Sequence, residues 1–319
     1  MSLFAGLVAQ TLHLALMLGL APGLAGLIRW MKARLLNRAG PPPRLAYRDL
    51  VRLMRKQTVR PESSSFVFAA APVVAAAASV LAAALVPSFS RGMTSEPLAD
   101  LLVIAGLLAL ARGALILGAM DAGSAVGGIG ASRVAAYAAF AEPAMLLVAV
   151  TLAVLLGTTN LDQLSALLQP GGGASHAPLG LASVALVASA LAQLGVGPIA
   201  SASSAAEPAM LFEALTHEHG GRDLALLEFG AAVRLITWFS LIAALFLPAF
   251  IAPASAFPLG WLIGLAAWAG KLALLAGALA LAEASMARIG VARSPGILGA
   301  AILLGLLAAT LVALGEGLT

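Results

Sequence analysis

Apolar residues run along this chain in long unbroken stretches instead of alternating with polar ones. Eight such stretches occur, at roughly 3–28, 66–87, 98–119, 134–157, 178–198, 225–252, 258–282 and 295–315. A helix needs about 20 apolar residues to cross the hydrocarbon core of a bilayer, whereas barrel strands alternate over about ten residues. The pattern therefore predicts an all-α polytopic membrane protein with about eight transmembrane helices.

Composition supports the same class. The 319 residues are 61% hydrophobic and 10% charged, whereas an ordinary soluble domain is about 25% charged. We expect a single membrane domain over 1–319. The first stretch leads directly into a charged loop and has no basic residues before it, so it is interpreted as a retained helix, not a cleaved signal. Cysteine is absent, which excludes cysteine-held clusters and disulfides within these residues.

The positions of the basic residues predict the orientation. Alternate loops hold fourteen Lys/Arg on one side and Arg91 alone on the other. Cytoplasmic loops carry the excess of positive charge. We therefore expect the basic side to face the cytoplasm and both termini to lie on the outer side of a cell membrane, the inner membrane if the source is bacterial.

The basic loop, 29–62, follows the first stretch and contains ten Lys/Arg. Within it, three arginines recur at helical spacing opposite four apolar residues. The arginines are Arg48, Arg52 and Arg55, and the apolar residues are Leu45, Leu50, Leu53 and Met54. This spacing predicts an amphipathic helix lying at the membrane interface. Such a loop serves either as an anchor on anionic lipid or as a functional surface.

Charged residues inside the apolar stretches are candidates for function. Glu142 lies about two turns inside one stretch and Glu228 near the start of another, and a carboxylate in hydrocarbon is costly unless it is paired or hydrated. Arg112 and Lys271, also inside stretches, are the natural counter-charges. A buried pair can relay protons or can simply fix the packing of two helices, and for Arg112 with Glu142 both alternatives remain open.

A second group of polar residues lies at a predicted cytoplasmic boundary. Glu213, His217 and Glu218 are at i, i+4 and i+5 and would share one side of a helix. His217 and His219 also raise the alternative of a metal site, but no third ligand is evident. Because histidine titrates near neutral pH, proton exchange with the bundle interior is the favoured interpretation.

Six short motifs occur in order along nearly the whole chain. They are Lys32-Ala33-Arg34-x-x-Asn37-Arg38-x-Gly40-Pro41 with Tyr47-Arg48-Asp49-Leu50, Asp121–Ser124 with Gly130–Arg133, Glu142–Leu147, Thr158–Leu161, Lys271-Leu272 and Glu283–Arg288. Together they resemble the membrane-anchor subunit of formate hydrogenlyase and related energy-converting nickel-iron hydrogenases, a family homologous to subunit 1 of respiratory complex I.

The family's signature segment is also similar, with two departures. Its proline and acidic residues correspond to Pro198, Glu207, Glu213 and Glu218. The aspartate expected two residues after the proline is Ala200, and the tyrosine and serine that end the segment are His219 and Gly220. If that aspartate takes part in coupling, this chain either couples differently or has become a scaffold.

The resemblance implies a cytoplasmic surface that docks a soluble arm. This surface comprises the basic loop, the region from Asp121 to Arg133 and an acidic segment at 199–224. In quinone-reducing relatives this surface helps form the quinone chamber, with the Asn37–Pro41 loop near its mouth. Its candidate residues here are Arg29, Lys32, Arg34, Asn37, Arg38, Gly40, Pro41, Arg48, Asp49 and Arg133.

Together with the charges described above, the resemblance also implies a path for protons or other ions. Its candidate residues are Glu142, Glu207, Glu213, Glu218, Glu228, Asp121, Arg112, Lys271 and His217.

The implied partners carry the redox chemistry. They are iron-sulfur and hydrogenase subunits at the cytoplasmic face, which hold the iron-sulfur clusters and a nickel-iron centre, and antiporter-like membrane subunits. No metal or cofactor is expected in this chain, and a quinone is not favoured because protons are the acceptor in hydrogenases. The alternatives are a quinone-site subunit of a complex I-like oxidoreductase and a stand-alone ion transporter.

Overall fold

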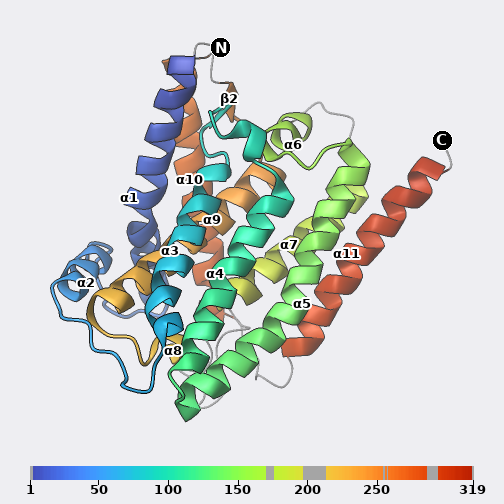
Figure 1. Ribbon diagram of the computed structural model, residues 1–319. Coiled ribbons are helices and arrows are strands. Elements are labelled where there is room, and N and C mark those ends of the chain that lie inside the picture. Colours follow the sequence, from blue (N-terminus) through green and yellow to red (C-terminus); the bar gives the residue numbers. More distant parts are fainter. Residues whose placement is uncertain are drawn as a thin grey trace.

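The computed structural model describes residues 3–169, 176–196, 213–253, 256, 258–285 and 294–317. These residues form long helices joined by short connections (Figure 1). The long helices are α1 (Leu3–Leu35), α3 (Phe66–Leu85), α4 (Leu101–Asp121), α5 (Ala125–Leu156), α7 (His176–Leu194), α9 (Gly221–Phe246), α10 (Leu259–Ser285) and α11 (Ser294–Gly317). The short elements are α2 (Leu45–Met54), η1 (Glu96–Leu98), α6 (Leu161–Leu167), α8 (Glu213–Thr216), β1 (Ser90–Arg91) and β2 (Ala252–Pro253).

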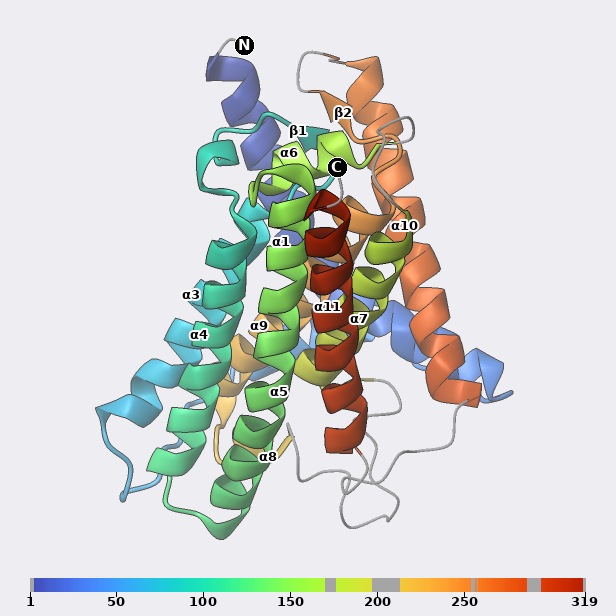
Figure 2. The ribbon, with the colours of Figure 1, turned by 90° about the vertical axis from the view of Figure 1, so that its right-hand side faces the viewer.

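Seven of the described helices are long and apolar enough to cross a membrane, and α7 adds a shorter apolar segment, Pro178–Leu194. The start of α1 and the end of α11 lie at the same end of the bundle (Figures 1 and 2). An even number of crossings is needed for this arrangement, and α7 supplies the eighth. The all-α polytopic architecture predicted from the apolar stretches is confirmed.

Two helices extend beyond the predicted stretches. α1 continues to Leu35 instead of ending near residue 28, and α5 begins at Ala125 instead of near residue 134. Hydropathy reports where lipid ends, whereas a helix ends where its backbone loses its hydrogen bonds. The Lys, Arg and Leu residues after Ile28 are good helix formers. At α5, the Ser124 hydroxyl accepts a hydrogen bond from the Gly127 amide and caps the helix.

Helix α9 forms the core of the bundle. In its most apolar window 78% of the residues are buried, against 28–50% for the other six candidate spans. It contacts α1, α2, α3, α7 and α10. The fully buried Trp238 is near its centre. Of the charged residues on α9, Asp223 is buried and Arg234 is partly buried, whereas Arg222 and Glu228 are exposed.

The predicted amphipathic helix is confirmed as α2. It buries Ala46 and Leu53 and contacts α1 and α9. The Tyr47 hydroxyl donates a hydrogen bond to the Gly19 carbonyl of α1 at 2.6 Å. Figure 1 shows α2 beside the lower part of α1. Its position at a membrane interface stays a prediction.

At the opposite end of the bundle, the connections are held by backbone pairing. β1 and β2 pair in parallel, with Ser90 opposite Ala252. Nearby, the Gly92 amide donates a hydrogen bond to the Asp162 carboxylate at 2.7 Å. Burial of Asp162 raises its pKa to about 6, although the Gly92 hydrogen bond opposes this effect.

Candidate functional site

An ion pair between α4 and α5 lies inside the helix bundle. The Arg112 Nη1 atom is 2.7 Å from the Glu142 Oε1 atom, and the two side chains are 6% and 40% exposed. The sequence predicted these two residues as partners, and the structure brings them together. A proton relay through this pair stays a prediction.

The buried guanidinium of Arg112 also belongs to a chain of polar side chains. Its Nη2 atom donates to the Gln193 side-chain oxygen on α7. The Gln193 amide donates to Ser189 at 3.1 Å, and the Ser189 hydroxyl donates to the Ala141 carbonyl of α5 at 2.7 Å. This chain connects α4, α5 and α7 through polar contacts in an otherwise apolar region.

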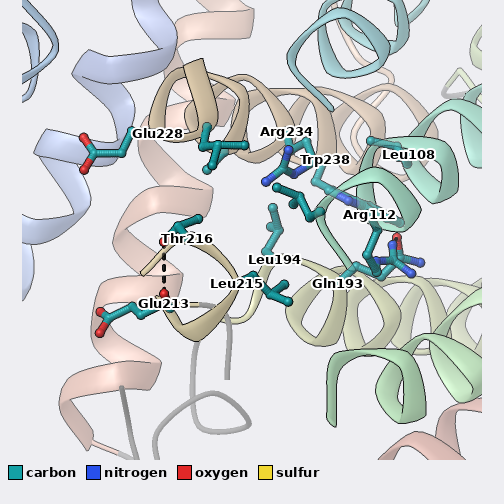
Figure 3. A pocket seen from close by; sticks show the side chains of 13 residues that line it. Leu108, Arg112, Gln193, Leu194, Glu213, Leu215, Thr216, Glu228, Arg234 and Trp238 are labelled. Carbon is teal, nitrogen blue, oxygen red and sulfur yellow. Dashed lines mark hydrogen bonds between the residues drawn. The ribbon is translucent and has the colours of Figure 1, made fainter. Parts of the chain in front are cut away.

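Next to this chain is a cavity of about 260 Å³, here called the inner cavity, between α4, α7, α8 and α9. Its polar lining includes the side chains of Arg112, Gln193, Glu213, Glu228 and Arg234. Figure 3 shows Arg112 and Arg234 on one side of it, with Glu213 and Glu228 on the other. The cavity therefore separates two fixed positive charges from two acidic groups.

Arg234 is held by helix α3. Its Nη1 atom donates to the Ser79 hydroxyl at 3.2 Å, and Ser79 in turn donates to the Ala75 carbonyl at 2.6 Å. A guanidinium stays protonated under all physiological conditions. Arg234 and Arg112 thus supply positive charge at the inner cavity without exchanging protons themselves.

A second cavity, of about 490 Å³ and here called the α2 cavity, lies between α1, α2 and α9. Most of its lining is apolar, with Arg29, Asp49 and Arg52 as polar contributors. Glu228 lines both cavities, as do Leu194 and Ala231. Glu228 is therefore placed between the basic loop and the inner cavity.

The first part of the basic loop is an extension of helix α1. Lys32 forms an ion pair with Glu283 of α10, with Nζ and Oε2 2.6 Å apart. The Arg34 guanidinium lies 5.4 Å from the centre of the Trp30 ring. After Leu35 the chain turns through Asn37, which has a φ of 54°. The predicted docking residues at this end of α1 are thus held in a defined geometry.

The turn after α1 packs closely against the helix. A Cβ added to Gly40 would lie 2.8 Å from the Ala33 Cβ atom. Only a residue without a side chain fits at this contact. Arg38 and Pro41, on either side of Gly40, belong to the same turn.

On α2, Arg52 pairs with Asp49 at 3.0 Å, while Arg48 lines a surface cavity with Arg52 and Arg55.

Asp121 has a local role at the end of α4. Its carboxylate accepts hydrogen bonds from the Ser65 amide at 2.7 Å, the Ser65 hydroxyl at 2.8 Å and the Phe68 amide at 3.1 Å. These amides are at the start of α3, where backbone amides have no acceptor within the helix. The structure makes Asp121 a cap for α3. A part for Asp121 in coupling stays a prediction.

In α5, the Arg133 Nη1 atom is buried and has no hydrogen-bond partner among the described residues.

The predicted helical cluster of Glu213, His217 and Glu218 does not form. α8 ends at Thr216, and His217 and Glu218 lie in the turn that follows. The chain turns because two glycines follow, and Gly221 has a φ of 57°. Glu213 and His217 are both exposed, and Glu213 lines the inner cavity.

His219 is the buried member of this segment. Its ring stacks on Phe68 with the ring centres 4.0 Å apart. Its Nδ1 atom has no hydrogen-bond partner among the described residues. Burial lowers the pKa of His219, against the opposing effect of the nearby Asp223. The same Asp223 accepts a hydrogen bond from Arg60 at 3.0 Å, which ties the end of the basic loop to α9.

The profile of the family described as NADH dehydrogenase matches residues 8–314 of this chain. The chain belongs to the NADH dehydrogenase family. Within curated proteins, it is 32% identical over 236 residues to hydrogenase-4 component C of Escherichia coli (strain K12), covering 73% of each chain. It is 29% identical over 228 residues to formate hydrogenlyase subunit 4 of the same organism, covering 72% of this chain and 73% of the relative.

A solved structure has the same fold. It is a chain of the membrane-bound sulfane sulfur reductase (MBS), described as an archaeal respiratory membrane complex, with a TM-score of 0.81 and 19% identity. The match covers 98% of this chain and 100% of that one. The resemblance found in the sequence motifs is confirmed. This member of the NADH dehydrogenase family is a membrane subunit of the complex I-related hydrogenase and oxidoreductase class.

Several residues of this family member extend the sequence predictions or fall outside the structure. Arg234 and Gln193 line the inner cavity but were not predicted as site residues. The signal that singled out Arg112, a charge within an apolar stretch, applies equally to Arg234. Glu207 and Ala200 lie outside the described residues.

Lys271 is not brought to either predicted acid. It lines a different cavity and donates a hydrogen bond to the Ala249 carbonyl at 2.6 Å.

Proposed function

We propose that this chain is the membrane base of a complex I-related hydrogenase and couples redox events in a docked soluble arm to proton or ion movement. The soluble arm would carry the iron-sulfur clusters and the nickel-iron centre. Antiporter-like membrane subunits would complete the ion path. The relatives' names, which refer to formate hydrogenlyase and hydrogenase-4, support the hydrogenase branch.

The observation that carries this proposal is the position of Glu228. Glu228 lines the α2 cavity together with Arg29 and Asp49, and it lines the inner cavity together with Arg234. A carboxylate between two cavities can take a proton from one and release it to the other. A change of charge near the α2 cavity would thus alter the proton occupancy of a group that faces the bundle interior.

The inner cavity provides the electrostatic reason for onward transfer. Arg112 and Arg234 are permanent positive charges, and they favour an ionised carboxylate nearby. Glu142 already occupies this role for Arg112 at 2.7 Å. A proton arriving at Glu142 would weaken that pair and leave Arg112 held mainly by its hydrogen bond to Gln193. Glu213, on the acidic side of the cavity, is a further acceptor.

Docking of the soluble arm is proposed for the basic end of the bundle. This end comprises the extension of α1 with Lys32 and Arg34, the turn through Asn37 and Pro41, helix α2 and the start of α5 with Arg133. Its excess of positive charge also supports a cytoplasmic location, with both termini on the outer side.

The decisive experiment tests Glu228 in the purified complex reconstituted in liposomes. Glu228→Gln is expected to reduce proton movement per hydrogen formed by at least about tenfold, because a proton-carrying group is removed. Hydrogen evolution with reduced viologen should persist. Glu96→Gln, at the opposite end of the bundle, is the matched control. Unchanged proton movement in Glu228→Gln would overturn the proposal and favour a scaffold that has lost coupling.

A quinone-site function is the second candidate, and the α2 cavity favours it. At about 490 Å³ with a largely apolar lining, it has the size and character of a small-molecule site. Quinone co-purified with the complex, and quinone reduction blocked by Leu53→Trp in the cavity wall, would support this function. Hydrogen evolution without any bound quinone would support the hydrogenase. Ion transport by the isolated chain in liposomes would instead support a stand-alone transporter.

A further inference from the structure

The α2 cavity and the inner cavity share a small part of their lining. Among the described residues, three line both cavities: Glu228, Leu194 and Ala231. Glu228 and Ala231 are three residues apart on α9 and therefore lie on the same face of this helix. Leu194 is the last residue of α7, and α7 contacts α9. The boundary between the two cavities thus consists of one acidic side chain and two apolar ones, contributed by two helices.

Leu194 packs against apolar side chains that belong to each cavity. One buried cluster in contact with it includes Trp238, which lines the inner cavity. A second cluster in contact with it is formed around α1, α9 and α10 and includes Leu235, which lines the α2 cavity. The Leu194 side chain therefore lies between the apolar walls of the two cavities.

The end of α7 fixes the position of Leu194. Gly195 follows it with a φ of 63°, a conformation that favours glycine. The Gly195 amide donates a hydrogen bond to the Ala192 carbonyl at 3.3 Å. The Val196 amide donates one to the Leu191 carbonyl at 3.2 Å. These two hydrogen bonds are the pair that closes a helix ending in a left-handed glycine. The backbone thus places Leu194 at the boundary.

The chemistry of the boundary restricts how a proton can cross it. Protons move through water or along polar groups, and a narrow apolar constriction excludes water. Among the described residues that line both cavities, Glu228 is the one with a polar side chain. Glu228 and Ala231 are both exposed, so open space lies beside this carboxylate on α9.

We propose that Leu194 and Ala231 form an apolar seal between the two cavities, so that a proton crosses the boundary on the Glu228 carboxylate instead of through water. The carboxylate takes up a proton on the side of the α2 cavity and becomes a neutral acid. It returns to the anion when it releases the proton to water or to Glu213 in the inner cavity. This inference rests on the proposed function of Glu228 and gives the reason why transfer depends on that residue.

Leu194 and Ala231 have different parts in the seal. Leu194 is a positioning residue, because it carries no proton and acts by keeping water out of the boundary. Ala231 has a small side chain and leaves the space in which the Glu228 side chain turns from one cavity to the other.

The test is a rescue experiment in the purified complex reconstituted in liposomes. Glu228→Gln lowers proton movement per hydrogen formed if the proposed function is correct. Adding Leu194→Ser replaces the apolar side chain with a small polar one and admits water. The double variant is expected to show at least about threefold more proton movement than Glu228→Gln alone. A purely structural role of Leu194 would not produce this rescue.

Leu181 provides the matched control. It is also a partly buried leucine of α7, and it lines neither the α2 cavity nor the inner cavity. Leu181→Ser in the Glu228→Gln background should restore no proton movement. Equal rescue by Leu181→Ser and Leu194→Ser would show a general loosening of α7 and would overturn the seal.

Ala231→Leu tests the boundary without opening it. The larger side chain fills exposed space beside Glu228, so we expect proton movement per hydrogen formed to fall although the carboxylate is intact. Hydrogen evolution with reduced viologen shows that the variant is assembled. If Leu194→Ser prevents assembly, this variant decides the matter, and unchanged proton movement in Ala231→Leu would overturn the seal.

The outcomes separate the seal from the proposed function. Loss of proton movement in Glu228→Gln without rescue by Leu194→Ser would overturn the seal and leave the function of Glu228 standing. Unchanged proton movement in Glu228→Gln alone would overturn the proposed function, and the seal with it.

Discussion

Arg112 of α4 and Glu142 of α5 form an ion pair at 2.7 Å in which the arginine is the more buried partner, with 6% of its side chain exposed against 40% for the glutamate. Loss of the glutamate would leave a buried guanidinium without its anion. Loss of the arginine would leave the Glu142 carboxylate, which is partly exposed and can still be hydrated. The two residues therefore make unequal contributions to stability.

We expect Glu142→Ala to lower the free energy of unfolding by about 2–3 kcal/mol, and Arg112→Met to lower it by less. The double variant should cost less than the sum of the two, because each single change removes the same interaction. Denaturant unfolding in detergent measures all three. Strict additivity would indicate that the pair contributes nothing to stability.

Asp121 caps α3 through three hydrogen bonds. Asp121→Ala is expected to speed hydrogen exchange of the Ser65 and Phe68 amides, because both lose their acceptor. Asp121→Asn keeps one side-chain oxygen and should have a smaller effect. Exchange measured by mass spectrometry reports on the first turn of α3. Ion movement by the assembled complex should be unchanged in Asp121→Asn. Its loss without a change in exchange would favour the predicted coupling role.

The raised pKa of Asp162 predicts a pH dependence of stability. The folded protein binds this proton with a pKa of about 6, whereas the pKa of an unburied aspartate is 3.8. Because the folded state holds the proton more tightly, stability falls as pH rises from about 4 to about 6 and stays lower above that range. The effect is at most ~3 kcal/mol.

Asp162→Asn removes this titration. An asparagine oxygen can still accept the hydrogen bond from the Gly92 amide, so we expect the variant to melt at a higher temperature than the wild type at about pH 8 and at a similar temperature at about pH 4. Melting curves in detergent at both pH values provide the measurement. A wild-type advantage at the higher pH would show that the carboxylate is stabilised by its surroundings.

Gly221 begins α9 with a φ of 57°, and a Cβ added there would collide with the Gln57 carbonyl. Gly221→Ala is therefore expected to destabilise the protein by about 1–3 kcal/mol and to displace the end of the basic loop. Gly106, in α4, has open space where a Cβ would be. Gly106→Ala should stabilise the helix by about 0.5–1 kcal/mol. Thermal unfolding of the two variants gives the comparison. Similar effects of Gly221→Ala and Gly106→Ala on stability would contradict the prediction.

Hydropathy located every long helix but misplaced some of their ends. α1 and α5 extend beyond the apolar stretches, because backbone hydrogen bonding continues where lipid contact stops. The cluster at Glu213, His217 and Glu218 failed for a related reason. Side-chain spacing assumes a continuous helix, and the glycines at 220 and 221 end it.

The candidate site was predicted in part. Arg112 and Glu142 were paired correctly because few other charges lie within the spans. The partner of Lys271 was not predicted correctly, because the sequence does not reveal which face of α10 packs against α9. For Asp121 the sequence predicted a part in coupling, and it did not reveal the hydrogen bonds of this residue to the start of α3.

The sequence by itself determined that this is a polytopic helical membrane protein of a complex I-related family. A helix that crosses a bilayer must be long and apolar, and both properties can be recognised from local composition. The tertiary structure alone decided that Glu228 lines two cavities, that Arg234 lines the inner cavity together with Arg112, and that Lys271 lines a different cavity. These relationships depend on how each helix is rotated and packed against residues far away in the chain, and no local pattern records that rotation.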